Sequence, residues 1–118
     1  MKTFRELRVW QKAHGLVLEI YRITEKFPDR ERFGLISQMR RSAVSVPANI
    51  AEGFKRRTDK EFRQFINIAS SSLEETKYYL ILSAELKYIN RVYQKLLDLS
   101  DEVGKMLYSF YKKLNSES

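Results

Sequence analysis

The chain has 118 residues, a length that suits one domain with a single core, and its 43% hydrophobic content is too high for a disordered protein. It has no cysteine and one histidine, His14, which excludes disulfides, thiol catalysis and thiolate zinc sites and leaves little basis for any transition-metal site. No apolar run approaches the roughly 18–20 residues that span a bilayer, and no apolar signal core follows Met1, so we expect a cytoplasmic protein.

The formal net charge of +7 is unevenly distributed. Residues 1–63 contain 15 Lys and Arg against 8 Asp and Glu, whereas residues 64–118 contain 7 of each kind. Because each phosphate that is neutralised releases counterions, a clustered excess indicates a polyanionic partner more strongly than a diffuse one. The alternative is a basic, solvated face without a specific partner.

The first predicted helix begins near Thr3 or Glu6, where Thr3-Phe4-Arg5-Glu6 fits a capping box. It ends at Phe27-Pro28, because the residue before a proline is disfavoured in the α region, and Asp29 is expected to cap the next helix. Residues of its inward row recur at steps of three and four, the period of one helical face: Leu7, Trp10, Ala13, Val17, Ile20 and Thr24.

The second predicted helix runs from about Arg32 to Phe54 and ends at Gly53 and the cluster of cations after it. Pro47 lies inside it, and because an interior proline removes a backbone hydrogen bond we expect a bend there rather than a break. Its inward row is Leu35, Met39, Ala43, Val46 and Ile50.

The third predicted helix starts at a second capping box, Thr58-Asp59-Lys60-Glu61, and stops near Leu86-Lys87-Tyr88. Its row is Phe62, Phe65, Ala69, Leu73, Thr76, Leu80 and Ser83, widened by Ile66 and Ile68. Asn90 is expected to cap the fourth helix, whose row is Val92, Leu96, Leu99, Val103, Met106 and Phe110. Long helices joined by short loops pack antiparallel, so residues 1–118 are predicted to form one all-α, up-down-up-down four-helix bundle.

The second predicted helix carries too little charge for the surface of a monomer. Between Phe33 and Phe54 the only charged residues are Arg40, Arg41 and Glu52. Opposite the core row lie Val44, Ala48 and Ala51, on a side that normally faces water. We therefore expect self-association through this helix. The alternative, that the helix is the central one of its bundle, is weakened because a four-helix bundle has no central helix.

A polar stripe forms the third face of this helix: Gln38, Arg41, Ser45, Asn49, Glu52 and Arg56. These residues lie within about 80° of one another on an ideal helix. Since buried polar groups need hydrogen-bond partners, we expect the stripe to fix a packing register. A catalytic or ligand site that uses Arg41, Asn49 and Glu52 is the weaker alternative.

No catalytic constellation is apparent, and we expect neither an enzyme nor a bound cofactor. The Glu-x-x-His step of carboxylate-bridged metal bundles is absent, because Gln11 stands three residues before His14. One histidine gives little basis for a hydrolytic triad, and the four glycines are too scattered to form a phosphate-binding loop.

The remaining candidate site is a basic hinge between the second and third helices. Lys55, Arg56, Arg57, Lys60 and Arg63 place five cations within nine residues, and Arg40, with Arg30 and Arg32, extends this surface. We predict phosphate-directed, sequence-tolerant nucleic-acid binding that is strengthened by avidity in an oligomer. The alternative is a solvated helix terminus whose cations suit the helix dipole.

Several motifs occur together in a specific combination: LxVWQKA at residues 7–13, FP at 27–28 followed by FGL at 33–35, QxRRSAVSVPANIAEG at 38–53, FxxFxxIA at 62–69 and SLxE at 72–75. Over roughly residues 4–90 the chain resembles the family of 23S rRNA intervening-sequence proteins. Ser71 departs from the pattern, since many members have glycine there. Lys87 departs from a Leu-Gly-Tyr pattern that usually closes the third helix.

The resemblance implies a four-helix bundle that assembles into a homopentamer, with the second helix at the subunit contacts and Pro47 as a family feature. A related branch is the accessory variability protein of diversity-generating retroelements, a basic pentameric barrel that binds nucleic acid and its reverse transcriptase. Two functions are therefore expected. The first is binding of rRNA or another structured RNA or DNA, and the second is an adaptor whose partner is a protein such as a reverse transcriptase.

Overall fold

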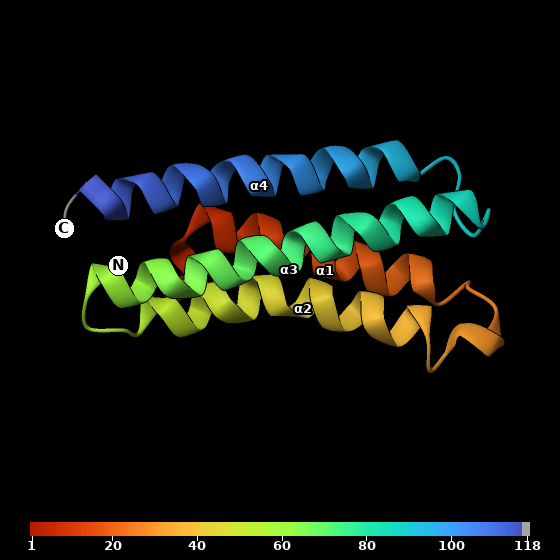
Figure 1. The fold of residues 1–118 in the computed structure, drawn as a ribbon, viewed down its shortest axis with the longest axis horizontal. Coiled ribbons are helices and arrows are strands. Elements are labelled where there is room, and N and C mark those ends of the chain that lie inside the picture. Colours follow the sequence, from red (N-terminus) through yellow and green to blue (C-terminus); the bar gives the residue numbers. More distant parts are fainter. Residues whose placement is uncertain (117–118) are drawn as a thin grey trace.

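The computed structural model describes residues 1–116, which form four helices in an antiparallel bundle (Figure 1). The helices are α1 (Arg8–Thr24), α2 (Leu35–Phe54), α3 (Asp59–Glu85) and α4 (Tyr93–Ser116), and the short 3-10 turns η1 (Phe4–Glu6) and η2 (Asp29–Glu31) precede the first two. Successive helices run in opposite directions, so the α2–α3 loop and the C-terminal end of α4 lie at the same end of the bundle. The predicted all-α, up-down-up-down architecture is confirmed.

Each helix packs against two others. α2 and α4 both contact α1 and α3, and within the described residues they lie diagonally opposite one another, with no close approach of their backbones. None of the helices in this part of the chain combines the length and the apolar character that crossing a bilayer requires.

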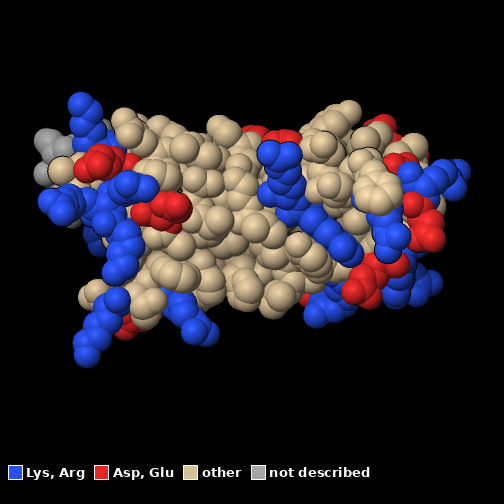
Figure 2. Space-filling model, turned by 90° about the horizontal axis from the view of Figure 1, so that it is seen from below, with Lys and Arg blue, Asp and Glu red and all other residues tan. Residues whose placement is uncertain are grey.

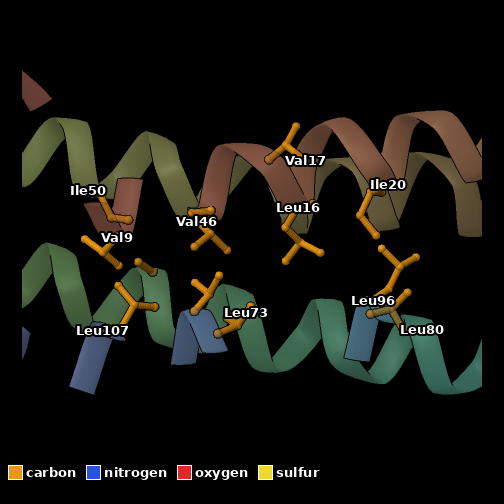
Figure 3. Close-up of a cluster of buried hydrophobic side chains, with 14 of the residues drawn as sticks. Val9, Leu16, Val17, Ile20, Val46, Ile50, Leu73, Leu80, Leu96 and Leu107 are labelled. Atoms are coloured by element: carbon orange, nitrogen blue, oxygen red, sulfur yellow. The ribbon is translucent and has the colours of Figure 1, made fainter. Parts of the chain in front are cut away.

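Apolar side chains from all four helices meet in one core (Figure 3). Every residue of the row predicted for the second helix is buried, and so are Leu73, Thr76 and Leu80 of α3. Ile68 does not widen the core as expected, because two helical steps of about 100° from Ile66 carry it to the solvent side. Val92 is also exposed, since it precedes the first residue of α4.

Two of the predicted helix caps differ in the structure. Asp29 is the first residue of η2 and does not cap α2; Gly34 holds that N-cap position without a side-chain bond, and Glu31 Oε1 accepts the Leu35 N–H at 3.4 Å. Asn90 lies three residues before α4, and its side chain accepts the N–H of Arg91 instead. In both places the residue that sequence reasoning assigned to the cap lies in a segment before the helix, Asp29 in η2 and Asn90 in the turn before α4.

The predicted N-terminal capping box is present, although it caps η1 rather than α1. The Thr3 hydroxyl accepts the Arg5 N–H at 3.3 Å, and Glu6 Oε2 accepts the N–H groups of Thr3 and Lys2. The two N–H groups that donate to the Glu6 carboxylate favour its ionised form, and the Thr3 N–H has the larger effect. They hold the pKa of Glu6 below its usual value.

α2 continues as one helix through Pro47, which is buried, and the bend at this proline stays a prediction. Near its end α2 approaches α3 closely. A Cβ on Gly53 would lie 2.5 Å from a ring carbon of Phe62 and 2.9 Å from Cβ of Phe65, closer than any side chain could sit. Glycine at position 53 therefore lets the two aromatic residues pack directly on the α2 backbone.

α3 ends in a left-handed residue, Lys87, with φ of 66°. The Lys87 N–H donates to the Ala84 carbonyl at 3.0 Å and the Tyr88 N–H donates to the Ser83 carbonyl at 2.9 Å, the two hydrogen bonds of a Schellman motif. Glycine is favoured at this position because it has no Cβ to clash with the backbone. The Leu-Gly-Tyr pattern thus has a structural reason, and Lys87 keeps the turn at the cost of backbone strain.

We predict that Lys87→Gly raises the free energy of unfolding by about 1 kcal/mol, because glycine relieves the strain of the positive φ. Urea denaturation followed by circular dichroism measures this difference. Lys87→Ala is the matched control, since it removes the same long side chain but keeps the Cβ. Equal stability of the two variants would contradict the assignment of strain to this residue.

Candidate nucleic-acid interface

The loop between α2 and α3 is held by a helix cap and by aromatic packing. The Thr58 hydroxyl accepts the Glu61 N–H at 3.1 Å and donates to Glu61 Oε2 at 3.0 Å, which fixes the start of α3. Beside the loop, the Phe62 ring packs against Phe54 and Phe110, with centroid distances of 6.5 and 5.2 Å. The loop therefore presents its side chains from a well-supported position.

Four cations project from this loop and the first turn of α3: Lys55, Arg56, Arg57 and Lys60, which we call the hinge cluster. All four are exposed, and the side chains of Lys55, Arg57 and Lys60 make no hydrogen bond or ion pair within residues 1–116. Arg56 pairs with Glu52 Oε2 at 2.9 Å and its guanidinium lies 4.5 Å from the centre of the Phe65 ring. Because an exposed ion pair is weak in water, a phosphate can replace it at little cost.

Two other predicted interface residues are engaged elsewhere. Arg63 lies one turn along α3 from Lys60, but its guanidinium donates to the Leu114 carbonyl at 3.1 Å and so links α3 to the end of α4. Arg40 is separated from Lys55 by 15 residues of α2, or about 22 Å of helix rise. Arg40 Nε donates to Thr24 Oγ1 at 2.9 Å, and its guanidinium stacks 4.5 Å from the centre of the Tyr21 ring.

The predicted polar stripe of α2 divides into parts with different environments. In its middle, Ser45 Oγ accepts hydrogen bonds from Ser72 of α3 at 2.8 Å and from Asn49 at 2.9 Å. Within residues 1–116, the Glu52 carboxylate pairs with Arg56 alone. Gln38 and Arg41 are exposed and have no side-chain hydrogen bond or ion pair in the described part of the chain. The stripe therefore bonds to α3 at its centre and leaves its first turn open.

A shallow groove of about 340 Å³ runs along the outer side of α2, and we call it the apolar groove. One wall is Val44, Pro47, Ala48 and Ala51 of α2, and the other is Phe4, Trp10, His14 and Val17. Trp10, which the sequence assigned to the core, is half-buried here and stacks on the His14 ring with centroids 4.9 Å apart. Viewed from this side, the middle of the molecule shows few charged side chains, while Lys and Arg gather towards both ends (Figure 2).

A second groove adjoins the first at Val44 and was not predicted. Its volume is about 500 Å³, and its lining combines Tyr21, Phe33, Ile36, Ser37 and Val44 with Arg32, Arg40 and Arg41; we call it the arginine groove. Phe33 is 91% exposed. The sequence feature that could have predicted this groove is Phe33, an aromatic residue that follows Arg30-Glu31-Arg32 and belongs to none of the predicted helical rows.

Comparison with known proteins then identifies the family. Residues 5–109 match the 23S rRNA-intervening sequence protein family. The chain belongs to this family. It is similar to a crystal structure of a protein of unknown function from the S23 ribosomal protein family of Bacteroides thetaiotaomicron, with 29% identity, 88% of this chain and 98% of that chain covered, and a TM-score of 0.81. No curated protein sequence matches it.

The resemblance read from residues 4–90 is thus confirmed, and neither match names an enzyme. Within the described residues of this family member, no group of three or more His, Asp or Glu side chains is placed to hold a metal ion. Exposed cations and two grooves border α2, the helix on which the proposal below is built.

We predict that Arg63 of this 23S rRNA-intervening sequence protein is a stabilising residue. Arg63→Gln loses the hydrogen bond to the Leu114 carbonyl, and the free energy of unfolding should fall by about 1–2 kcal/mol. Thermal unfolding should show a midpoint several degrees lower. Arg57→Gln is the control, because its exposed side chain has no partner in residues 1–116 and its loss should change stability by less than about 0.5 kcal/mol. Equal midpoints for the two variants would contradict the assignment.

Proposed function

We propose that this 23S rRNA-intervening sequence protein is a non-enzymatic homo-oligomer that binds nucleic acid through hinge clusters repeated on its subunits. The observation that carries the proposal is the distribution of charge around α2, apolar along its outer side and cationic at its end (Figure 2). The apolar side suits another copy of the chain, and the cations suit phosphates.

Self-association is supported by the residues that line the apolar groove. Val44 is 39% exposed although it lies in the middle of a helix, and Ala48 beside it is exposed as well. Small residues allow another backbone to approach closely, and burying apolar area contributes roughly 25 cal/mol per Å². Among the described residues that line the groove there is no Asp, Glu, Lys or Arg, and the one titratable side chain is His14, so burying the groove leaves no carboxylate, lysine or arginine unpaired. The family resemblance favours five subunits.

Nucleic-acid binding is supported by the open state of the hinge cluster. Lys55, Arg57 and Lys60 have no competing partner within the described residues, and the nearby Glu61 carboxylate is held by the Thr58 hydroxyl. A few cations per subunit bind phosphates weakly, but several subunits acting on one polyanion bind with avidity. The family's name refers to 23S rRNA, which favours structured RNA as the ligand.

We predict that Ala48→Glu converts the oligomer into monomers, because it places a carboxylate inside the buried apolar contact. Size-exclusion chromatography with light scattering measures the mass. Affinity for a structured RNA hairpin should also fall, at least tenfold, since avidity is lost. Ser109→Glu is the control, as it adds the same charge at an exposed position of α4, the helix diagonally opposite α2. An Ala48→Glu protein with the wild-type mass would contradict this interface.

The hinge cluster is tested by changing Lys55, Arg57 and Lys60 together to glutamine. RNA affinity at physiological salt should fall at least tenfold, and the slope of log affinity against log salt should flatten by about 0.7–0.9 for each lost phosphate contact. Fluorescence anisotropy with a labelled hairpin measures both. The control changes Lys95, Lys105 and Lys112 of α4 to glutamine, which removes the same charge from another exposed surface.

Equal losses in the two triple variants would assign binding to net charge rather than to the hinge cluster. A wild-type protein that ignores RNA and DNA at physiological salt would contradict the proposal. It would then favour the adaptor hypothesis, in which a protein such as a reverse transcriptase is the partner.

A further inference from the structure

Phe33 occupies an unusual position for a large aromatic residue. It lies between η2 and α2 and is 91% exposed, so in the isolated chain it forgoes the roughly 1.5–3 kcal/mol that burial of a phenylalanine contributes. Its backbone is nevertheless well anchored. Glu31 in η2 accepts the Tyr88 hydroxyl at 2.8 Å on one carboxylate oxygen and the Leu35 N–H at 3.4 Å on the other. The ring is thus an exposed platform on a supported turn.

Three arginines line the arginine groove together with Phe33. Arg40 is held against α1 by the Thr24 hydroxyl and the Tyr21 ring. Arg32 and Arg41 are exposed and have no side-chain hydrogen bond or ion pair in residues 1–116. No Asp or Glu is among the described residues that line the groove, so its three arginines have no carboxylate there to offset their charge.

The combination of an exposed ring with unpaired guanidinium groups has a specific chemical match. A nucleobase stacks on an aromatic face, while arginine binds phosphate in a bidentate manner and stacks on rings as well. Inside a duplex the base faces are covered by neighbouring bases, so only unpaired nucleotides can use such a platform. The groove begins at the N-terminus of α2, where the helix dipole adds partial positive charge next to the arginines.

We propose that the arginine groove binds an unpaired segment of nucleic acid, with one base stacked on Phe33 and the flanking phosphates bound by Arg32 and Arg41. This inference rests on the proposed nucleic-acid binding and adds a second contact, which reads single-stranded character. The hinge cluster lies at the other end of α2, about 22 Å from Arg40 by helix rise. The two contacts together favour an RNA that has an unpaired loop beside a helical stem.

A second copy of the chain fits this groove less well. Packing Phe33 against an apolar surface would also bury Arg32 and Arg41, whose charges would then need carboxylates from the other copy. The apolar groove has no Asp, Glu, Lys or Arg among its described lining residues, so self-association through it uses the middle of α2, between the two proposed nucleic-acid contacts at the ends of the helix.

The test uses the full chain and a short single-stranded RNA that carries 2-aminopurine, whose fluorescence falls when it stacks on an aromatic ring. Phe33→Leu keeps an apolar side chain but removes the ring, and Phe33→Trp keeps a ring. Wild type and Phe33→Trp should bind and quench the probe. Phe33→Leu should lose the quenching and bind the single strand roughly tenfold more weakly, as expected for one lost base stack. Its affinity for a fully paired duplex should not change.

Three results would overturn the inference. In the first, Phe33→Leu still quenches the probe and binds like the wild type, while the hinge triple variant loses RNA affinity. This result would exclude the arginine groove as a binding site but leave the proposed function intact. If light scattering gave Phe33→Leu a different number of subunits from the wild type, the groove would be a contact between copies of the chain. A wild type that binds neither the single strand nor the duplex would remove the proposed function and the inference together.

Discussion

The scarcity of charge on two opposite sides of α2 is the constraint on which the rest of the structure depends. On the inner side, Met39, Val46 and Ile50 are fully buried against the neighbouring helices. Gly53 lets α3 approach so closely that Phe62 packs on the α2 backbone. On the outer side the helix carries Val44, Ala48 and Ala51, so its charges are confined to the ends and to the arginine groove. One helix thus organises the core, provides the apolar groove and determines where cations can gather.

Most of the fold could be predicted from the sequence because its signals are local. The spacing of apolar residues predicts the buried row of α2, and the Thr58 cap predicts the start of α3 within one residue. The two misplaced caps lie where a turn has no strong signature, since Asp29 belongs to η2 and Asn90 precedes α4 by three residues. The predicted stop of the third helix near Leu86-Lys87-Tyr88 is confirmed, with Lys87 in the left-handed conformation.

The candidate site was less predictable, because the partner of a long side chain depends on residues that are distant in sequence. Arg40 bonds to Thr24 sixteen residues away, and Arg63 bonds to Leu114 across 51 residues. These contacts separate structural arginines from those still open to a ligand, and no local pattern distinguishes the two groups. The arginine groove likewise combines residues that are distant in sequence, since α1 brings Tyr21 beside Arg40. The sequence therefore predicts where cations are concentrated, but the packing of the helices determines which of these side chains are free of partners within the described residues.

In the function we propose, nucleic-acid binding depends on self-association, since each subunit offers few cations and a ring of subunits would multiply them. The most direct measurement is the mass of the wild-type protein in solution, by native mass spectrometry or by light scattering at micromolar concentration. We predict a multiple of the 14.1 kDa subunit mass, with five subunits favoured by the family resemblance. A mass of one subunit throughout this concentration range would contradict the role we assign to the outer side of α2.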